Sequence, residues 1–472
     1  MSAIGTFASA RLRAGTMNGG GAASAAPAGT GVLWNELSVA DLPVARAELE
    51  LASSTGTLEL LGAGDGASKV MTLVRLHSAP LGVVFLDGRR GLSRRAHVGT
   101  IWSALGDAIN RHLASDGLDR LVRAEDLVQP LPDGLTRCQD RRRTVLAQAP
   151  CVSVVVATRE RHESLRRCLS SLLASEYPRF EVIVVDNDPA TAATAEMVEH
   201  SFPGQIRYLR ESRRGLGAAH NRGVAEASGT IIAFVDDDVV VDRHWLAALA
   251  EGFAVTGDVG CVTGLILPAQ LDTPAQVLLE RHGGFGKGFD LQIFDRRGHR
   301  PADPLFPFRS GRFGSGANMA FDASLLRRLG GFDPAIGTGT FARGGDDLTA
   351  FFRVLVAGSR LVYQPGALVW HRHHRDLASL GNQAYGYGVG FGAYLASAIA
   401  HEPAMLPALL RRVPGGVAFA ARRSSASNAD RYQDWPSEFV GLERRGMIFG
   451  PFAYLVSRWR ARGAARPSEV AA

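Results

Sequence analysis

The chain has 472 residues, which is too long for a single compact core, so its length predicts two or three domains. A hydrophobic fraction of 46% and a charged fraction of 21% are those of an ordinary soluble globular protein. The formal charge of +6 comes almost wholly from arginine, and no basic patch is interleaved with aromatic residues, so the composition argues against a nucleic-acid-binding protein.

The cysteines and the N-terminal segment indicate the compartment. Cys138, Cys151, Cys168 and Cys261 have no CxxC spacing, so we expect neither disulfides nor a zinc framework, as in a reducing compartment. Residues 1–30 are rich in Ala, Gly and Ser, and we interpret them as a disordered tail rather than a signal peptide. No apolar window of about 18 residues occurs, which predicts no transmembrane helix and a cytoplasmic protein.

The segment that follows the tail is expected to form a small α+β domain. Strand-like runs at 70–76 and 81–86 flank a short turn and predict a hairpin, and apolar spacing over 101–113 predicts a helix. We find no clustered His, Cys or acid pair here, so we expect a structural or docking role. Residues 117–150 then lack sustained periodicity and are interpreted as a linker.

From residue 152 the pattern becomes strand, helix, strand, helix. Such alternation predicts an α/β domain, Rossmann-like, with a mostly parallel sheet and helices on both faces. Its central strand is an apolar run, 231–235, that leads directly into three aspartates. The predicted strands are 152–157, 181–185, 206–209 and 231–235.

The three aspartates, Asp236, Asp237 and Asp238, lie where a parallel sheet binds its ligands, beyond the carboxyl ends of the strands. Crowded carboxylates repel one another unless a cation lies among them. Hard oxygen ligands on a short loop suit Mg²⁺ or Mn²⁺. We therefore predict a metal site here, with a solvated acidic turn as the alternative.

Other polar residues follow the neighbouring strands. Thr158 and Arg159 come after the first strand, and Asp186 after the second, where an acid commonly accepts hydrogen bonds from a ribose or a base. Asp186 is alternatively a simple turn residue. Two arginines, the second of them Arg214, precede Gly215 at a helix N-terminus, an arrangement that suits a diphosphate. The Gly-x-Gly pair there lacks a third glycine, which argues against a nicotinamide site.

An ordered series of motifs extends over roughly 152–375. Its members are 154–159, 184–187, 215–223, 234–238, 316–321, 330–333 and 344–348. The series resembles the family 2 glycosyltransferases, whose nucleotide-sugar domain has the GT-A fold. The resemblance implies an inverting, divalent-metal-dependent enzyme that moves a sugar from a nucleoside diphosphate to an acceptor hydroxyl, on a cell-envelope glycan, a polysaccharide or a lipid-linked acceptor.

The resemblance also implies roles for individual residues. It implies a donor site made of Thr158, Arg159, Asp186, Arg214, Gly215, Asn221 and Asp236. Within that site Asp186 would recognise the nucleobase, and Asp236 would face the ribose. A Mn²⁺ or Mg²⁺ ion would be held by Asp238 or Asp237, since three adjacent acids leave the register open.

The catalytic base is expected at the start of a later helix. Asp347 falls where the family places its base, with Asp346 where glutamate is common and Thr349 where another aspartate often stands, so the choice between Asp346 and Asp347 stays open. Without the series of motifs the pair reads equally well as a helix cap. One base and no protein nucleophile imply a single displacement, and hence inversion at the anomeric carbon.

Two histidines and the C-terminal region complete the prediction. His371 and His373 face the same side if the stretch is extended, so we expect them as metal ligands or else as structural histidines. Residues 448–459 are amphipathic if helical, and their basic surroundings suit an anionic membrane surface as well as plain packing. The expected boundaries are a tail at 1–30, a small domain at 31–116, a linker at 117–150, a GT-A domain at 151–375 and a helical, basic region at 376–472.

Other functions fit the sequence less well than a transferase. A processive polysaccharide synthase would carry membrane spans and a QxxRW motif, but here Leu455 stands where glutamine is needed before Arg458 and Trp459. A phosphoryl transferase would need a P-loop, which is absent. The remaining alternative is a catalytically silent module that binds nucleotide sugars.

Overall fold

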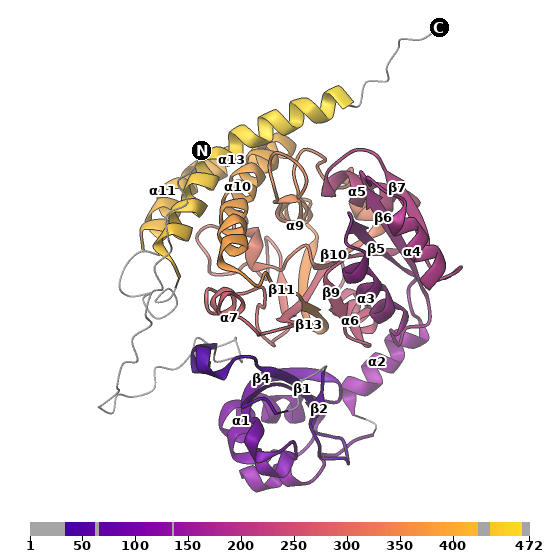
Figure 1. Ribbon diagram of the computed structural model, residues 1–472, viewed down its shortest axis with the longest axis vertical. Helices are drawn as coiled ribbons and strands as arrows, with labels where there is room; N and C mark the ends of the chain where they lie inside the picture. The colour runs from indigo at the N-terminus through magenta and orange to yellow at the C-terminus, as the bar shows by residue number, and fades with distance from the viewer. Residues whose placement is uncertain (1–33, 62–65, 135, 423–434, 465–472) are drawn as a thin grey trace.

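The computed structural model describes residues 34–61, 66–134, 136–422 and 435–464 (Figure 1). A small domain lies at one end, a larger α/β domain follows, and long C-terminal helices cover one side of that larger domain. The tail expected at 1–30 lies outside the described residues.

The small domain is a four-stranded sheet with one helix. The sheet has the order β2-β1-β3-β4, and β3 pairs with β4 in antiparallel register, which confirms the predicted hairpin. The bounds are β1 Ala45–Glu50, β2 Glu59–Leu60, β3 Lys69–Leu76, β4 Ala79–Asp87 and α1 Val98–Asp116. Apolar residues of α1, among them Ile101 and Ile109, pack on one face of the sheet, as the helical spacing predicted.

The segment expected to be a linker contains helical structure. A 3₁₀ helix at Ala124–Val128 precedes α2, which spans Arg137–Ala147. The side chain of Thr136 accepts a hydrogen bond from the backbone N–H of Gln139 and caps the N-terminus of α2. No residue of α2 is fully buried, so the helix has no continuous apolar face, and hydrophobic periodicity missed it.

The larger domain is built on a nine-stranded sheet. Its order is β11-β13-β10-β12-β8-β5-β6-β7, with β9 paired to β13, and the run from β8 to β7 is parallel. Strand order reverses beside β5, because β6 follows on one side and β8 lies on the other, so the switch point lies between β5 and β8. The bounds are β5 Val152–Thr158, β6 Phe180–Asn187, β7 Arg207–Glu211, β8 Ile231–Asp236, β9 Val239–Val241, β10 Val259–Pro268, β11 Gln292–Phe294, β12 Asn318–Asp322 and β13 Arg360–His371.

Helices cover both faces of this sheet, as the alternation predicted. Successive residues of β8 point to opposite faces: Phe234 packs in the core beside α5, α8 and α9, while Val235 packs in the core beside α3, α4 and α6. The bounds are α3 His162–Leu173, α4 Ala193–Ser201, α5 Leu216–Glu226, α6 Trp245–Ala254, α7 Pro274–Arg281, α8 Ala323–Arg328 and α9 Asp346–Val356.

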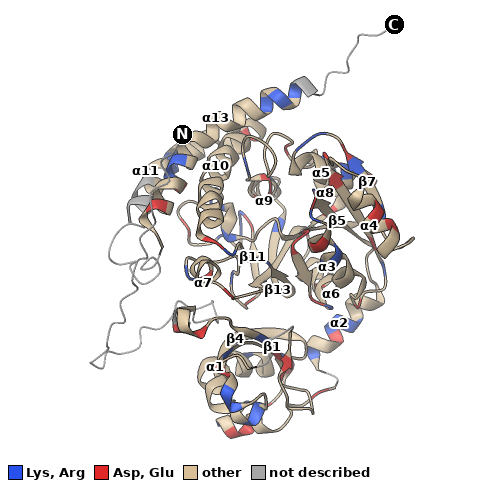
Figure 2. Ribbon diagram, in the orientation of Figure 1, with Lys and Arg blue, Asp and Glu red and all other residues tan. Residues whose placement is uncertain are grey.

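The C-terminal region is helical, with α10 Leu377–His401, α11 Leu406–Arg422 and α13 Ser437–Ala464. Helices α10 and α13 run in the same direction and approach closely at glycines: a Cβ added at Gly388 would lie 2.0 Å from the carbonyl oxygen of Glu443. Figure 2 shows basic residues gathered near the end of α13. Within the described ranges, no helix is both long and apolar enough to cross a bilayer.

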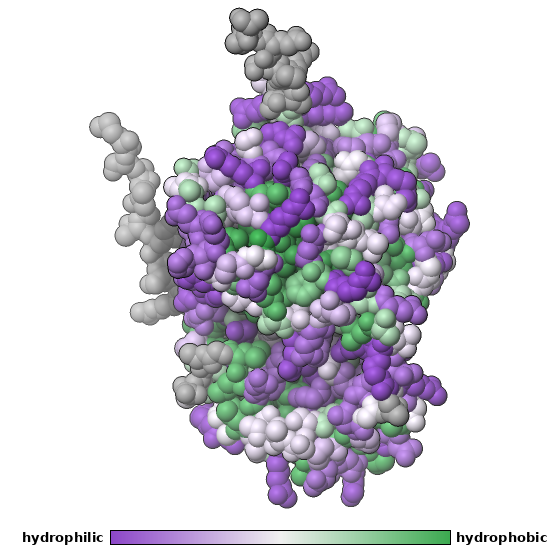
Figure 3. Space-filling view, turned by 90° about the vertical axis from the view of Figure 1, so that its right-hand side faces the viewer, coloured by the Kyte–Doolittle hydropathy of each residue, from purple (hydrophilic) through white to green (hydrophobic). Residues whose placement is uncertain are grey.

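The second face of the small sheet packs on the larger domain. Met71, Leu73, Val83 and Phe85 of the β3–β4 hairpin belong to the same buried core as Leu271 of the larger domain. The buried guanidinium of Arg75 on β3 also forms an ion pair with Asp242, which precedes α6. The space-filling view accordingly shows the small domain and the larger body as one continuous surface (Figure 3).

Candidate active site

Acidic residues and a histidine gather beyond the carboxyl ends of the sheet. Asp236, Asp238 and His371 each offer one ligand atom, and the three atoms lie within 4.8 Å of one another. His371 reaches this position because β13 pairs with β9 in a register that sets His371 opposite Val239, the residue after Asp238. Strand β8 therefore delivers the acids and β13 the imidazole.

The atoms of this group are arranged to receive a cation. His371 Nε2 lies 3.3 Å from Asp238 Oδ1, but that oxygen is buried and accepts no well-formed hydrogen bond. Burial, followed by the charge of Asp238, raises the pKa of Asp236. Burial also acts on Asp238, but His371 and Arg161 outweigh it and hold the pKa of Asp238 below its usual range. A carboxylate with an unpartnered buried oxygen, beside a second acid and an imidazole, fits a hard divalent ion.

Asp237 does not join this group. Its buried carboxylate accepts a hydrogen bond of 2.6 Å from Thr158 Oγ1 and one of 2.6 Å from Arg161 Nη1. Asp237 was expected as a possible ligand of the ion, but in the turn that follows β8 its carboxylate instead contacts Thr158 and Arg161. Thr158 likewise contacts Asp237, where the sequence suggested that it lines a nucleobase pocket.

His373 lies between His371 and Glu280 and contacts both. Its Nε2 lies 2.6 Å from Glu280 Oε1 on α7, and its Nδ1 lies 3.1 Å from Nδ1 of His371. The two rings do lie together, as the spacing of two suggested. Because Glu280 occupies the outer nitrogen of His373, this ring orients its neighbour and stands outside the group of ligand atoms.

The residues expected to bind the donor do not all lie beside the acidic group. Asp186 is buried at the end of β6; its Oδ2 accepts a hydrogen bond of 3.0 Å from the hydroxyl of Tyr208, and its Oδ1 has no hydrogen-bond partner. Burial raises the pKa of Asp186. Arg159 is exposed and forms an ion pair of 3.4 Å with Asp188, so it remains near the end of β5 but not beside the acidic group.

The turn before α5 and the helix itself carry three further residues that were expected to bind the donor. Gly215 has φ of 132°, its N–H donates to Asn187 Oδ1 at 2.8 Å, and a Cβ would lie 2.8 Å from the methyl group of Thr340. Arg214 is exposed beside it. Asn221 was expected to bind the donor, but both polar atoms of its side chain bind the backbone of Phe332 at 2.8 Å. Asn221 therefore joins α5 to the loop before α9.

Asp346 and Asp347 open α9 after Gly345, which is left-handed with φ of 91°. Asp346 is buried, and burial, followed by the charge of Asp347, raises its pKa. Asp347 is only partly buried, and its Oδ2 accepts the N–H of Gly316 at 2.9 Å. Burial raises the pKa of Asp347 as well, although this N–H, that of Leu348 and the charge of Lys287 oppose the rise.

The two acidic groups face the same part of the molecule. The charge of Asp236, at the end of β8, is among the causes that raise the pKa of Asp346, after burial and Asp347. The charges of Glu280 and Asp347 both act on Lys287, where they oppose the burial that lowers its pKa to about 8. The ends of β8 and β13 and the start of α9 therefore form one charged cluster.

A comparison with known families matches residues 153–330 to the model described as glycosyl transferase family 2. Residues 153–330 belong to glycosyltransferase family 2. The resemblance drawn from the motif series is thereby confirmed, and with it the GT-A fold of the larger domain.

Curated relatives and a solved structure resemble the glycosyltransferase domain. The pre-mycofactocin glycosyltransferase of Mycobacterium tuberculosis is 29% identical over 48% of this chain and 43% of its own length. The glucosyl-dolichyl phosphate glucuronosyltransferase of Haloferax volcanii is 25% identical over 47% of this chain and 69% of its own. The mannosyltransferase PcManGT from Pyrobaculum calidifontis, solved with GDP-Man and Mn²⁺, is 22% identical with a TM-score of 0.41, over 68% of this chain and 93% of its own. This chain spans less than half the length of the first of these relatives.

Three charged residues of the glycosyltransferase domain escaped the sequence analysis. Arg161 bridges Asp237 and Asp238, Lys287 lies beside Asp347, and Glu280 holds His373. Lys287 is one of only two lysines in the chain, which is the one signal that could have drawn attention to it. Arg161 and Glu280 carry no such signal, because arginine and glutamate are common in this sequence.

Proposed function

We propose that this glycosyltransferase moves a sugar from a nucleoside diphosphate donor to an acceptor hydroxyl with inversion at the anomeric carbon. The observation that carries the proposal is the shared cluster in which Asp347 opens α9 while Asp236, Asp238 and His371 gather at the ends of β8 and β13. A transfer of this kind needs a proton acceptor near the incoming alcohol and a counter-charge for the leaving diphosphate.

Asp236, Asp238 and His371 are the residues that would hold a divalent ion, Mn²⁺ or Mg²⁺. An ion bound there supplies Lewis-acid stabilisation of the negative charge on the departing diphosphate. Arg161 donates to Asp237 at 2.6 Å and to Asp238 at 2.9 Å, so its positive charge favours the ionised form of both carboxylates and it orients Asp238. His373 and Glu280 orient the ring of His371 in the same way.

Asp347 is the proposed general base. Asp347 is a partly exposed residue, while Asp346 is buried with a raised pKa, so we take Asp347 as the member of the pair that meets the alcohol. Backbone N–H groups of Gly316 and Leu348 hold the carboxylate in one orientation. A single base without a protein nucleophile supports one displacement step. The acceptor oxygen attacks the anomeric carbon, the bond from that carbon to the diphosphate oxygen breaks, and the proton of the alcohol passes to Asp347.

Asp186 is the proposed contact for the nucleobase. Its Oδ1 is buried without a hydrogen-bond partner at the end of β6, the strand next to β5. A base N–H would satisfy this acceptor, which otherwise costs free energy in a buried site. Arg214, exposed beside Gly215 at the start of α5, is the proposed positive charge for the diphosphate.

The acceptor is proposed to be a glycan or a lipid-linked glycan approached from a membrane surface. Large apolar side chains lie exposed on one face of α13, with Ile448 83% exposed and Trp459 75% exposed; Phe452 and Leu455 fall between them at helical spacing. Arginines follow in the last turns of the helix. An apolar stripe with basic flanks supports peripheral contact with anionic lipid at the cytoplasmic face of a membrane.

A thermal-shift panel tests the donor assignment. Protein would be heated with UDP-, GDP- and dTDP-sugars, with and without Mn²⁺, and a bound donor raises the melting temperature by mass action. We expect one nucleotide class to raise the melting temperature only when Mn²⁺ is present, and the rise to vanish in Asp186→Ala and in Asp238→Asn. A shift without any donor hydrolysis or transfer would favour the alternative, a silent nucleotide-sugar-binding module.

A further inference from the structure

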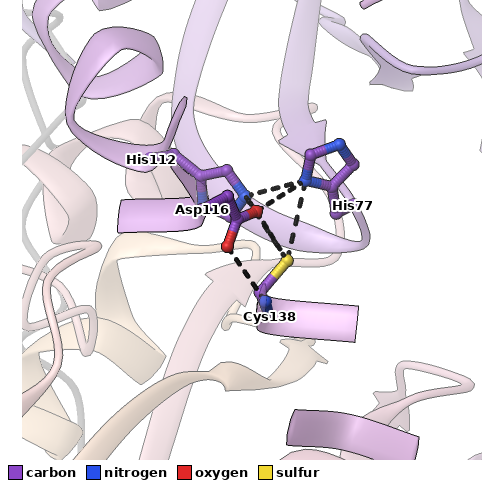
Figure 4. Close-up of side chains that lie close together, drawn as sticks. All are labelled: His77, His112, Asp116 and Cys138. Carbon is purple, nitrogen blue, oxygen red and sulfur yellow. Dashed lines mark hydrogen bonds and ion pairs between the residues drawn. The ribbon is translucent and has the colours of Figure 1, made fainter. Parts of the chain in front are cut away.

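Four potential metal ligands meet where α2 contacts the small domain, and none of them belongs to the glycosyltransferase site (Figure 4). His77 lies in the turn between β3 and β4, His112 and Asp116 lie one turn apart on α1, and Cys138 lies in the first turn of α2. The expectation that this part of the chain holds no cluster of His, Cys and acid is therefore wrong. His77 and Cys138 are 61 positions apart, so motif spacing could not connect them.

The four ligand atoms form a compact tetrahedron. His77 Nδ1 lies 3.2 Å from His112 Nε2 and 3.0 Å from Asp116 Oδ2, and the latter two atoms are 3.3 Å apart. Cys138 Sγ lies 3.6 Å from His77 Nδ1, 3.8 Å from His112 Nε2 and 2.9 Å from Asp116 Oδ2. A tetrahedral zinc ion separates its ligands by roughly 3.3 Å for N and O pairs and roughly 3.6 Å for N and S pairs.

We propose that His77, His112, Asp116 and Cys138 form a structural site for Zn²⁺ or a similar divalent transition metal. Five of the six separations match the zinc geometry within a few tenths of an ångström, and only the contact between sulfur and Asp116 is shorter. If hydrogen bonds alone held these four atoms together, each close pair would need its own hydrogen. Here every atom lies close to the other three, so six hydrogens would be needed among four side chains. Two imidazoles, a thiolate and a carboxylate are borderline-soft ligands that select zinc over Mg²⁺.

The surroundings orient these ligands toward the common centre. His77 Nε2 lies 2.8 Å from the carbonyl oxygen of Pro132 and donates its hydrogen there, which leaves the lone pair of Nδ1 directed at the cluster. The other oxygen of Asp116 accepts the backbone N–H of Cys138 at 2.9 Å. The side chains of His77 and Asp116 are almost fully buried, whereas that of His112 remains 12% exposed and offers an ion a way in.

The turn that carries His77 is held in an unusual conformation. His77 and Ser78 both have left-handed backbones, with φ of 53° and 67°, although neither is glycine. The carboxylate of Glu50 accepts both of their N–H groups, at 3.0 and 2.9 Å, and so keeps the turn closed. Non-glycine residues in this region persist where the surrounding structure requires them, often at binding sites.

An ion at this position would attach α2 to the small domain. Helix α2 continues toward the glycosyltransferase domain, where Arg142 forms an ion pair of 2.6 Å with Glu251 on α6. With four protein ligands and no open position, the site has the character of a structural zinc centre. Its consequence is a fixed connection between the small domain and the catalytic one.

Metal content of the whole protein tests the proposal. The full chain would be expressed with zinc in the medium, freed of any affinity tag and dialysed against a weak chelator. We expect zinc equimolar with protein in the wild type and in the control Cys151→Ser, a cysteine outside the cluster. Zinc should fall to background in Cys138→Ala and His112→Ala.

Cobalt substitution keeps the test decisive if an alanine variant fails to fold. Protein loaded with Co²⁺ should show thiolate-to-cobalt charge-transfer absorption together with the intense visible bands of a tetrahedral ion. The variant Cys138→His should retain the ion and its tetrahedral bands but lose the charge-transfer absorption. Wild-type protein without zinc, zinc content unchanged in Cys138→Ala, or charge transfer unchanged in Cys138→His would each overturn the proposal.

Discussion

At the scale of residues, adjacent carboxylates have different environments and hence different roles. Asp346 and Asp347 follow one another in the sequence, but only Asp346 is buried, with His220 Nδ1 3.7 Å away. Asp347 instead accepts hydrogen bonds from backbone N–H groups, and the positive charge of Lys287 lowers its pKa against the effect of burial. Helix geometry sends neighbouring side chains in different directions, so one acid is withdrawn into the core while the other stays accessible.

Substitution of the proposed base separates chemistry from binding. Asp347→Asn should lower turnover by roughly 10²- to 10⁴-fold, the usual contribution of a general base, because an amide cannot accept the proton. Donor affinity, measured by isothermal titration with a nucleotide sugar and Mn²⁺, should be nearly unchanged. Asp346→Asn is the matched control and should retain far more turnover. Equal losses in the two variants would contradict the assignment of Asp347.

The charge of Lys287 should influence the pH dependence of the reaction. The base acts when ionised, and the ammonium of Lys287 lowers the pKa of Asp347. Lys287→Met removes that positive charge, so the pKa of Asp347 rises and the acidic limb of the kcat/KM profile moves to higher pH. Activity should recover as the pH is raised. A profile with the same acidic limb in both proteins would show that Lys287 does not act on the base.

At the scale of elements, close helix packing supports the catalytic loop. Helix α10 contacts α13 through Gly388 on one side and the loop before α9 through Gly390 on the other. A Cβ at Gly345 would lie 2.4 Å from the carbonyl oxygen of Gly390, so the backbone that precedes Asp346 is pressed directly against α10. The orientation of the two aspartates therefore depends on packing against the C-terminal helices, and like these helices the aspartates lie beyond the matched residues 153–330.

Two glycines of α10 allow a matched test of this packing. Gly388→Ala places a methyl group 2.0 Å from the carbonyl oxygen of Glu443 and should destabilise the protein by about 1–3 kcal/mol, the usual cost of overpacking. Gly386→Ala meets no atom within 4 Å and should be neutral or stabilise by up to about 1 kcal/mol through helix propensity. Melting temperatures of the two variants check this, and a similar loss in both would refute close packing at Gly388.

At the scale of the whole molecule, three parts are joined by buried contacts. The small sheet shares a core with the glycosyltransferase domain, and Arg75 pairs with Glu48 of its own domain and with Asp242 of the other. The C-terminal helices cover the loop before α9 on another side. On α13 this leaves the exposed apolar stripe, for which a membrane surface is the proposed partner.

Vesicle sedimentation tests the role of α13. The double variant Ile448→Ser/Trp459→Ser removes two exposed apolar side chains and should weaken binding to anionic vesicles by at least about tenfold. Val122→Ser, which removes an exposed apolar side chain from the segment before α2, is the control and should bind like the wild type. Binding should decline with salt and be weak on zwitterionic vesicles. Equal binding of all three proteins would contradict the proposed surface.

The sequence by itself determined the elements whose periodicity is strong and the family to which their motifs belong. The hairpin of the small domain, helix α1, and the parallel strands that end at Thr158, Asn187 and Asp236 were all predictable. These elements bury apolar faces, so the periodicity of hydrophobic residues along the sequence predicts them directly. Helix α2 escaped because it has no such face and depends on its cap and on contacts with α1 and α6.

Only the tertiary structure decided which polar side chains meet. It assigned His371 to the acidic group and gave Asp237 to Arg161, and it turned Asn221 toward the backbone of Phe332. It also brought His77 and Cys138 together across 61 positions. The physical reason is that a motif constrains spacing along the chain, whereas a binding site requires directions in space, and those directions are set by strand register, helix phase and packing.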